Sequence, residues 1–189
     1  MTLSIQPTKT LSIEEFLKLP ETKPASEYID AEIYQKPMPQ GEHSTLQSSL
    51  VTAINEIGKP QKLVYAFPEL RCTFQGRSIV PDIAVFEWQR IPLLPNGRIA
   101  NKFEIPPDWV IEILSPGQSA NRVISKIIFS LENGAKLGWL LDASDESIMI
   151  FEPNKLPQLK QKQDNLPVLG VLENWQLTVA DVFRWLNFT

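Results

Sequence analysis

The sequence predicts an α+β protein in which a central mixed β-sheet is flanked by helices. Apolar residues recur at helical spacing over residues 44–57 and again over 119–133. Between these segments, short runs such as 79–86 and 108–114 are rich in β-branched and apolar residues and resemble buried strands. The sequence contains no internal repeat and no low-complexity segment, so we expect a single domain over residues 1–189.

In the first half of the chain, each expected element is bounded by a cap or a turn. The elements are a short helix beginning at Ser12, a hairpin over 27–35, a helix over 44–57, and strands over 63–67, 69–75 and 79–86. Ser12 with Glu15, and Ser44 with Gln47, have the spacing of capping boxes. Cys72 alternates with polar neighbours, which indicates a core residue rather than a nucleophile.

The second half predicts a strand over 108–114, a helix over 119–133, a hairpin over 137–153 and a final helix capped by Thr178. The polar, proline-containing stretch 154–166 is expected to be an exposed loop. The helix over 119–133 should dock through a stripe of four apolar residues, Ile124, Ile127, Ile128 and Leu131. Lys126 lies nearly opposite this stripe, a position that also fits a solvated surface lysine.

The composition argues against several classes of site and partner. With one cysteine and one histidine in 189 residues, zinc sites, disulfide scaffolds and thiol redox pairs have too few ligands or partners. The net charge of −4 argues against a protein that coats nucleic acid through a broad basic surface. The chain has no membrane-length apolar run, and its first ten residues lack the order of a secretory signal. We therefore expect a cytoplasmic protein without membrane association, whose chemistry uses carboxylates and lysines.

Two carboxylates stand inside apolar strands, Asp82 in IVPDIAVF and Glu112 in WVIEIL. A buried carboxylate is costly unless a cation, a hydrogen-bond donor or water lies beside it. Pro81 cannot donate to a strand ladder, so pairing should be interrupted there. Two carboxylates on adjacent strands suit Mg²⁺, or Mn²⁺ in its place, because hard cations take oxygen ligands. A structural ion pair with Arg71 or Arg122 fits the pattern equally well.

Three motifs occur together in this region and beyond it. They are Val80-Pro81-Asp82-Ile83, Glu112-Ile113-Leu114-Ser115-Pro116, and the spacing of Lys126, Gly134, Trp139 and Asp142. In this combination the chain resembles the bacterial "putative restriction endonuclease" family, of the Uma-two type, within the restriction-endonuclease-like superfamily. The resemblance extends from about Ser12 to the C-terminus.

The resemblance implies a restriction-endonuclease-like core and a metal-dependent nuclease site with Asp82 and Glu112 at its two carboxylate positions. Superfamily members commonly place a lysine two residues after the glutamate, where this chain has Leu114. In this family a lysine on the following helix replaces it, which is Lys126 here. Such an amine would position or activate the attacking water, or stabilise charge on the phosphate. The resemblance also implies DNA as the substrate and, since such nucleases often cut two strands with two subunits, a homodimer.

Other candidates for the site remain open at this level. Glu27 could be a third acidic group, but an exposed hairpin position is the simpler expectation; His43 is expected to be a capping or surface residue, and nothing fixes Glu69 near the site. Five cations could contact phosphates around the cleft or belong to a solvated loop: Arg71, Arg77, Arg90, Arg98 and Lys102.

The predicted function is a Mg²⁺-dependent endonuclease that hydrolyses DNA through Asp82, Glu112 and Lys126. The alternative is a catalytically inactive fold relative that binds nucleic acid or protein. A third possibility is a purely structural homodimer, which would be favoured if arginines paired the carboxylates and closed them to solvent.

Overall fold

The computed structural model describes residues 11–189. The first ten residues, where we predicted no secretory signal, lie outside this range. The helices are α1 (Ile13–Phe16), α2 (Gly41–Gly58), α3 (Ala120–Glu132) and α4 (Val179–Arg184), with 3₁₀ turns η1 (Trp88–Arg90) and η2 (Gly170–Leu172). The strands are β1 (Ser26–Ile29), β2 (Glu32–Gln35), β3 (Val64–Pro68), β4 (Cys72–Phe74), β5 (Arg77–Ile79), β6 (Ile83–Glu87), β7 (Trp109–Ile113), β8 (Leu137–Asp142), β9 (Ser147–Phe151) and β10 (Gln158–Gln161).

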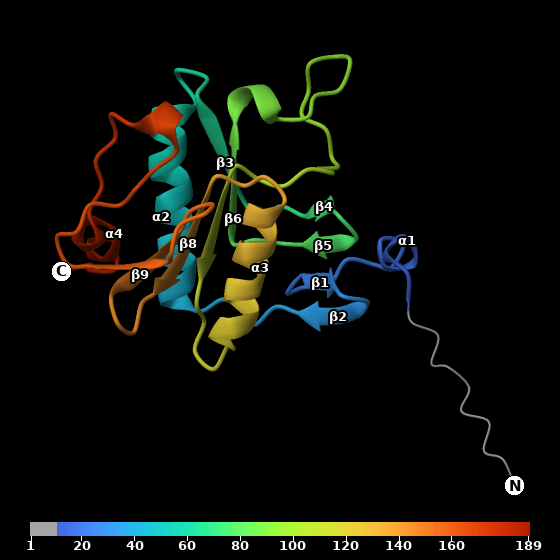
Figure 1. Cartoon of the computed structure of the whole chain (residues 1–189), viewed down its shortest axis with the longest axis horizontal. Coiled ribbons are helices and arrows are strands. Elements are labelled where there is room, and N and C mark those ends of the chain that lie inside the picture. The colour runs from blue at the N-terminus through green and yellow to red at the C-terminus, as the bar shows by residue number, and fades with distance from the viewer. Residues whose placement is uncertain (1–10) are drawn as a thin grey trace, which may run out of the picture.

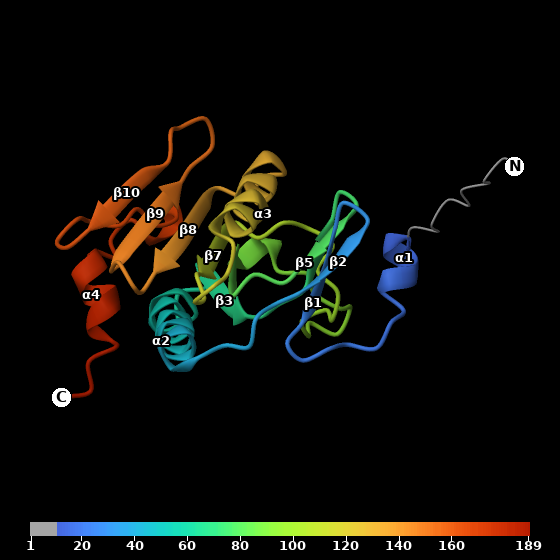
Figure 2. The same cartoon turned by 90° about the horizontal axis from the view of Figure 1, so that it is seen from below.

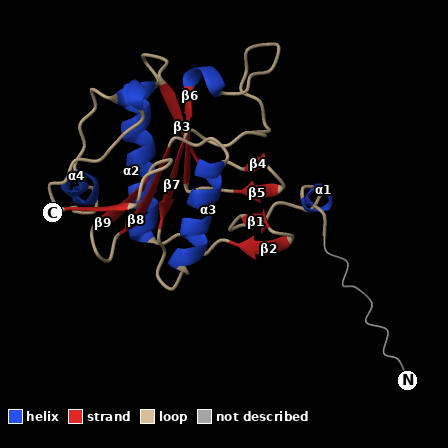
Figure 3. Ribbon diagram, in the orientation of Figure 1, coloured by secondary structure: helices blue, strands red, loops and turns tan. Residues whose placement is uncertain are grey.

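The strands form two sheets, which confirms the predicted α+β class with a mixed sheet (Figures 1 and 3). The larger sheet has the order β10-β9-β8-β7-β6-β3, in which β7 and β8 are parallel and the other neighbours are antiparallel. The smaller sheet has the order β2-β1-β5-β4 and is antiparallel. Within residues 11–189, no helix has both the length and the apolar character that crossing a membrane requires.

Helices cover both faces of the larger sheet (Figure 2). The main core lies on one face, where α2 and α4 pack against the strands through residues such as Leu50, Ile54 and Val182. On the other face, α3 packs Val123 and Ile127 against Val110 of β7 and neighbouring strands. Because burying such side chains contributes about 1.5–3 kcal/mol each, these two faces hold the helices on the sheet.

Turn and cap chemistry accounts for most of the predicted boundaries. Asp30 and Ala31 both have positive φ, at 52° and 65°, as a tight two-residue hairpin turn requires. Ser12 makes the predicted capping box at α1, and Thr178 caps α4 as predicted and also makes a capping box with Asp181. Cys72 is fully buried, in agreement with its predicted place in the core.

One predicted helix boundary and one predicted loop are wrong. Helix α2 begins at Gly41 rather than Ser44, and Gln47 makes no capping box, because its side-chain amide donates instead to the backbone oxygen of Asp82. The stretch predicted as an exposed loop, 154–166, contains strand β10, which pairs with β9 at the edge of the larger sheet. Most of the residues of β10 are exposed, so backbone pairing alone defines it and no apolar alternation marks it in the sequence.

The buried side of α3 also differs from the predicted stripe. Ile128 is 42% exposed, whereas Lys126 is 3% exposed. The reason is that α3 touches both sheets: Phe129 stacks on Phe74 of the smaller sheet, with ring centroids 4.9 Å apart. The helix therefore has two buried sides, and Lys126 lies on one of them rather than in solvent.

Candidate functional site

The candidate site lies where the chain crosses from the smaller sheet to the larger one. Strand β5 ends at Ile79 and β6 begins at Ile83, so Val80, Pro81 and Asp82 belong to neither ladder. This confirms the predicted interruption at Pro81, which has no N–H to donate. Because β6 and β7 are antiparallel with Ile83 opposite Ile111, Asp82 comes beside Glu112 of β7.

Asp82 is 2% exposed and is surrounded by donors. Its Oδ2 accepts a 2.7 Å hydrogen bond from the backbone N–H of Ile113 and lies 3.2 Å from Nε2 of His43. Its Oδ1 accepts a 2.6 Å hydrogen bond from Nζ of Lys36. Burial acts to raise the pKa of Asp82, but the hydrogen bond from His43 and the charge of Lys36 outweigh it and hold this pKa well below the usual range. The carboxylate is therefore ionised at neutral pH.

Glu112, Lys126 and Glu27 form the second half of the cluster. The Nζ of Lys126 donates a 2.9 Å hydrogen bond to Oε1 of Glu27 and lies 2.9 Å from Oε1 of Glu112. The Glu27 oxygen also accepts from the backbone N–H of Val80 at 2.8 Å. Burial raises the pKa of Glu112 to about 7. Burial acts to lower the pKa of Lys126, but Glu112 and then Glu27 raise it above its ordinary value. Lys126 is therefore a protonated donor.

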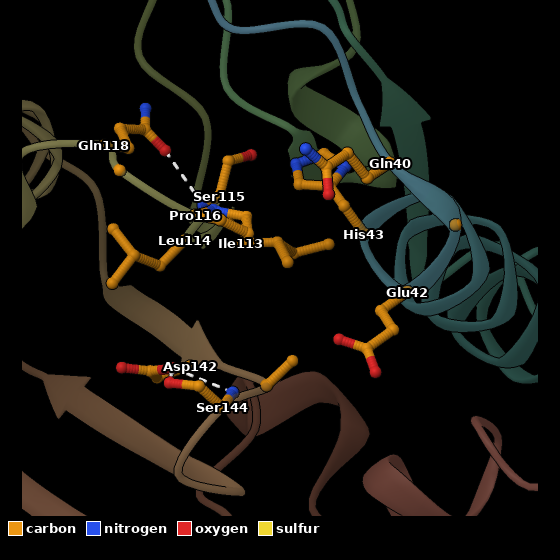
Figure 4. A pocket seen from close by; sticks show the side chains of 13 residues that line it. Gln40, Glu42, His43, Ile113, Leu114, Ser115, Pro116, Gln118, Asp142 and Ser144 are labelled. Atoms are coloured by element: carbon orange, nitrogen blue, oxygen red, sulfur yellow. Dashed lines mark hydrogen bonds between the residues drawn. The ribbon is translucent and has the colours of Figure 1, made fainter.

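A pocket of about 450 Å³ adjoins this cluster (Figure 4). Its lining comes from three segments: residues 40–43 at the start of α2, residues 113–118 after β7, and the turn at 142–144. In Figure 4, Gln40, Glu42 and His43 lie across the pocket from the segment that carries Ser115 and Gln118. His43 and Ile113 line the pocket and also contact Asp82, so the pocket reaches the cluster on this side.

Comparisons with known proteins give the chain a family. The model of the family described as "Putative restriction endonuclease" matches residues 13–180. The protein belongs to this family. Its structure is also similar to a crystal structure described as a "putative nuclease" from Anabaena variabilis. The two share 48% identity over 93% of this chain and 99% of that chain, with a TM-score of 0.91. A search of curated proteins gives no match.

The family resemblance inferred from the motifs is thus confirmed, and membership supports a nuclease. The three residues predicted for the site, Asp82, Glu112 and Lys126, lie together, although 44 positions separate the first from the last in the sequence numbering. Lys126 reaches Glu112 from α3, whereas the position two residues after Glu112 carries the apolar Leu114.

Sequence reasoning placed two members of the cluster wrongly and missed a third. The expectations of an exposed Glu27 and a surface His43 are wrong, since these residues are 3% and 7% exposed. Lys36 was not anticipated, because it follows β2 in a segment with no periodic pattern. Glu69 stays at the margin: its side chain is 47% exposed, with Oε1 4.0 Å from Nζ of Lys36.

The arginines expected around the carboxylates have other partners. Arg71 binds Glu21, and Arg122 lies over the ring of Tyr34, 4.3 Å from its centroid. The idea that five cations surround the cleft is also wrong: Arg77 pairs with Asp30 and Arg90 with Asp108. Arg90 and the exposed Arg98 and Lys102 belong to the connection between the end of β6 and the start of β7. This connection lies at the other end of these strands from Asp82 and Glu112. Lysines, not arginines, therefore neutralise the site.

Proposed function

We propose that the protein is a metal-dependent nuclease that hydrolyses DNA phosphodiester bonds. In this proposal Asp82 and Glu112 hold Mg²⁺, or Mn²⁺ in its place, and Lys126 is the cationic helper. The observation that carries it is the meeting of these three motif residues in one buried cluster beside a pocket. Family membership supports the nuclease activity, and the donor chemistry of the cluster supports the metal.

The residues fit a hard divalent cation in the chemistry of their donors. Asp82 and Glu112 offer carboxylate oxygens, and the close partner of the buried Oε1 of Glu112 is the ammonium group of Lys126 at 2.9 Å. Among the described residues there is no group of three or more His, Cys, Asp or Glu side chains set to hold a metal. Mg²⁺, however, is often held by only one or two carboxylates, with water and substrate phosphate completing its coordination. When bound, it would supply orientation of the phosphodiester, a lowered pKa of water and charge neutralisation.

The charge of the cluster also supports a bound metal cation. Three carboxylates, Glu27, Asp82 and Glu112, face the two ammonium groups of Lys36 and Lys126. A phosphodiester would add a further negative charge to a buried site whose two ammonium groups are already matched by carboxylates, even when Glu112 is protonated. Such a charge is costly in a low-dielectric environment unless a cation accompanies it.

The protonation state of Lys126 excludes a role as a general base. Since Glu112 and Glu27 hold its pKa above the ordinary value, its Nζ carries a proton and cannot accept another from water. Of the roles open to this lysine, donation to a phosphate oxygen is therefore the one that we assign to it. The N–H of Ile113 and Nε2 of His43 fix the Oδ2 side of Asp82, which holds this carboxylate in one orientation.

The finer parts of the proposal concern substrate and setting. DNA is the proposed substrate, and the cytoplasm is the proposed location. A homodimer would bring two such sites to the two strands of a duplex, as nucleases of the superfamily often do. Analytical ultracentrifugation with and without duplex DNA tests this part, since a monomer in both conditions would contradict it.

A second candidate is a fold relative that binds nucleic acid or protein without catalysis. Two observations favour it: Asp82 and Glu112 are only 2% and 1% exposed, and each lies against a lysine. A cluster that is buried and paired in this way can serve structure alone. The experiment below separates the two candidates.

The test compares plasmid cleavage and Mn²⁺ binding by calorimetry in wild type, Asp82→Asn and Glu112→Gln. Asp145→Asn serves as the control, because this carboxylate is exposed in the β8–β9 turn. We expect wild type and control to cleave DNA only with Mg²⁺ or Mn²⁺, and the two site variants to lose cleavage and metal binding while remaining folded. Unchanged metal affinity in both site variants would sink the metal assignment. DNA binding without cleavage, unaffected by Asp82→Asn, would favour the binding module.

A further inference from the structure

Lys36 is a second buried lysine at the site, and its surroundings differ from those of Lys126. Its side chain is 8% exposed, and its backbone N–H is fixed by a 2.9 Å hydrogen bond to the oxygen of Ala25. Its Nζ donates to Oδ1 of Asp82 at 2.6 Å and to the backbone oxygen of Val80 at 2.9 Å. A carboxylate and a backbone carbonyl are both oxygen donors of the kind that hard cations take. The ammonium group thus occupies oxygen surroundings suited to a cation.

Both oxygens of Asp82 already have partners. Oδ1 binds Lys36, while Oδ2 binds the N–H of Ile113 and faces His43. The Ile113 contact is a backbone contact within the sheet region and cannot be exchanged without moving β7. The contact with Lys36 depends on a flexible side chain, so it is the one that an incoming cation can replace.

We propose that Lys36 is a positioning residue that sets the metal affinity of the site, because its ammonium group competes with a divalent cation for Oδ1 of Asp82. This inference rests on the proposed metal-dependent function. Lys126 does not play this part for Asp82, since its closest carboxylate oxygens belong to Glu27 and Glu112. Of these two lysines, Lys36 is therefore the one that contacts an oxygen of Asp82, and Lys126 is the one that contacts Glu112.

The size of the effect follows from the distance between the charges. The Nζ of Lys36 lies 2.6 Å from Oδ1 of Asp82, so its positive charge repels a divalent cation that approaches the same oxygen. The cation must displace this ammonium group before it can bind Oδ1. Removing the ammonium group should therefore tighten Mn²⁺ binding by about tenfold or more.

A purely structural role makes a different prediction. The bond from Lys36 to Val80 ties the segment after β2 to the crossover between the sheets, so its loss would lower thermal stability without changing metal affinity. Lys36→Met keeps most of the apolar stem and removes the charge. Lys36→Gln also removes the charge and keeps a donor for the Val80 oxygen. Lys36→Arg retains the charge and is the conservative rescue.

The experiment is a calorimetric titration of Mn²⁺ into the full chain for wild type and these three variants, with thermal melts on the same samples. Lys160→Met on β10 is the matched control for loss of one positive charge. We expect the dissociation constant to fall about tenfold or more in Lys36→Met and Lys36→Gln, and to stay near wild type in Lys36→Arg and Lys160→Met.

Two results would overturn the inference, and they are distinguishable. If wild type binds Mn²⁺ and the neutral variants bind it equally or more weakly, Lys36 does not compete, and the proposed metal site stands. If neither wild type nor any Lys36 variant binds Mn²⁺, both the inference and the metal-dependent function fail. Binding by the neutral variants alone would support the competition in its strongest form.

Discussion

Gly138 of β8 determines how closely α3 approaches the larger sheet. A Cβ at this position would lie 2.3 Å from Cγ2 of Ile127, 3.4 Å from Cβ of Phe151 and 3.6 Å from Cγ1 of Val110. Carbon atoms in contact lie about 3.5–4.0 Å apart, so Gly138→Ala would force α3 and the sheet apart by more than about 1 Å. The methyl of Ile127 cannot swing aside cheaply, because a β-branched side chain in a helix has one strongly preferred rotamer.

The sign of the stability change tests this reasoning. Without a clash, replacing glycine by alanine stabilises a protein by about 0.4–1 kcal/mol through the unfolded state. Overpacking a well-packed core costs about 1–3 kcal/mol, so we expect Gly138→Ala to lose about that much free energy of unfolding in urea titrations. The displacement would also lengthen the 2.9 Å contact between Lys126 and Glu112 beyond hydrogen-bond distance, so the proposed nuclease activity should fall as well.

Two variants make this prediction specific to the contact. Gly170→Ala is the control, because a Cβ there would meet nothing within 4 Å. Ile127→Leu removes the methyl from Cβ, so the double variant with Gly138→Ala should recover about 1 kcal/mol relative to the sum of the single changes. A Gly138→Ala protein as stable as wild type, or more stable, would refute the close approach of α3.

Three further predictions concern burial and capping. Lys126→Met should lower the free energy of unfolding by about 3–5 kcal/mol in urea, since it leaves Glu112 without its ion partner in the interior; a loss below 1 kcal/mol would mean that the pair is solvated. Burial raises the pKa of Cys72 to about 12, so iodoacetamide at pH 8.5 should modify this thiol in urea but not in the native protein, as read by mass spectrometry. The same shift means that the contribution of Cys72 to stability is complete below the thiol's unfolded pKa and is lost as pH rises toward 12. Thr178→Ala should cost about 1 kcal/mol through loss of its capping bond with Asp181, and an unchanged melting temperature would contradict this.

Periodicity in the sequence was sufficient for most of the fold because it records which faces of an element are buried. The α2 stripe marks one buried face, whereas the continuous apolar runs of β6 and β7 mark strands that are buried on both faces. Helix α3 contacts two sheets, so a single stripe describes it poorly and Ile128 is left exposed. Strand β10 is the opposite case, since its exposed edge carries no apolar pattern at all.

Some residues of the candidate site could likewise be predicted from the sequence and others could not. Asp82 and Glu112 could be singled out because an ionisable group inside an apolar strand requires a compensating partner. The identity of that partner is a tertiary fact: the expected arginines lie elsewhere, and Lys36 and Glu27 arrive from segments around the β1–β2 hairpin. No local pattern marks such residues, because what matters is where the hairpin docks.

Because buried charged residues from several segments meet at the site, the effect of a substitution on activity has to be separated from its effect on stability. Removing one member of a buried ion pair leaves the other uncompensated, so an inactive Lys126 variant could be inactive because it is unfolded. Replacing both members by neutral groups of similar shape is often close to neutral for stability. Because Lys126 also binds the buried Glu27, we expect Lys126→Met combined with Glu112→Gln and Glu27→Gln to regain much of the stability lost in Lys126→Met alone, while the proposed nuclease activity and Mn²⁺ binding stay absent. Such a stable and inactive triple variant would separate the proposed catalytic role of these residues from their structural one, because purely structural residues would regain function together with stability.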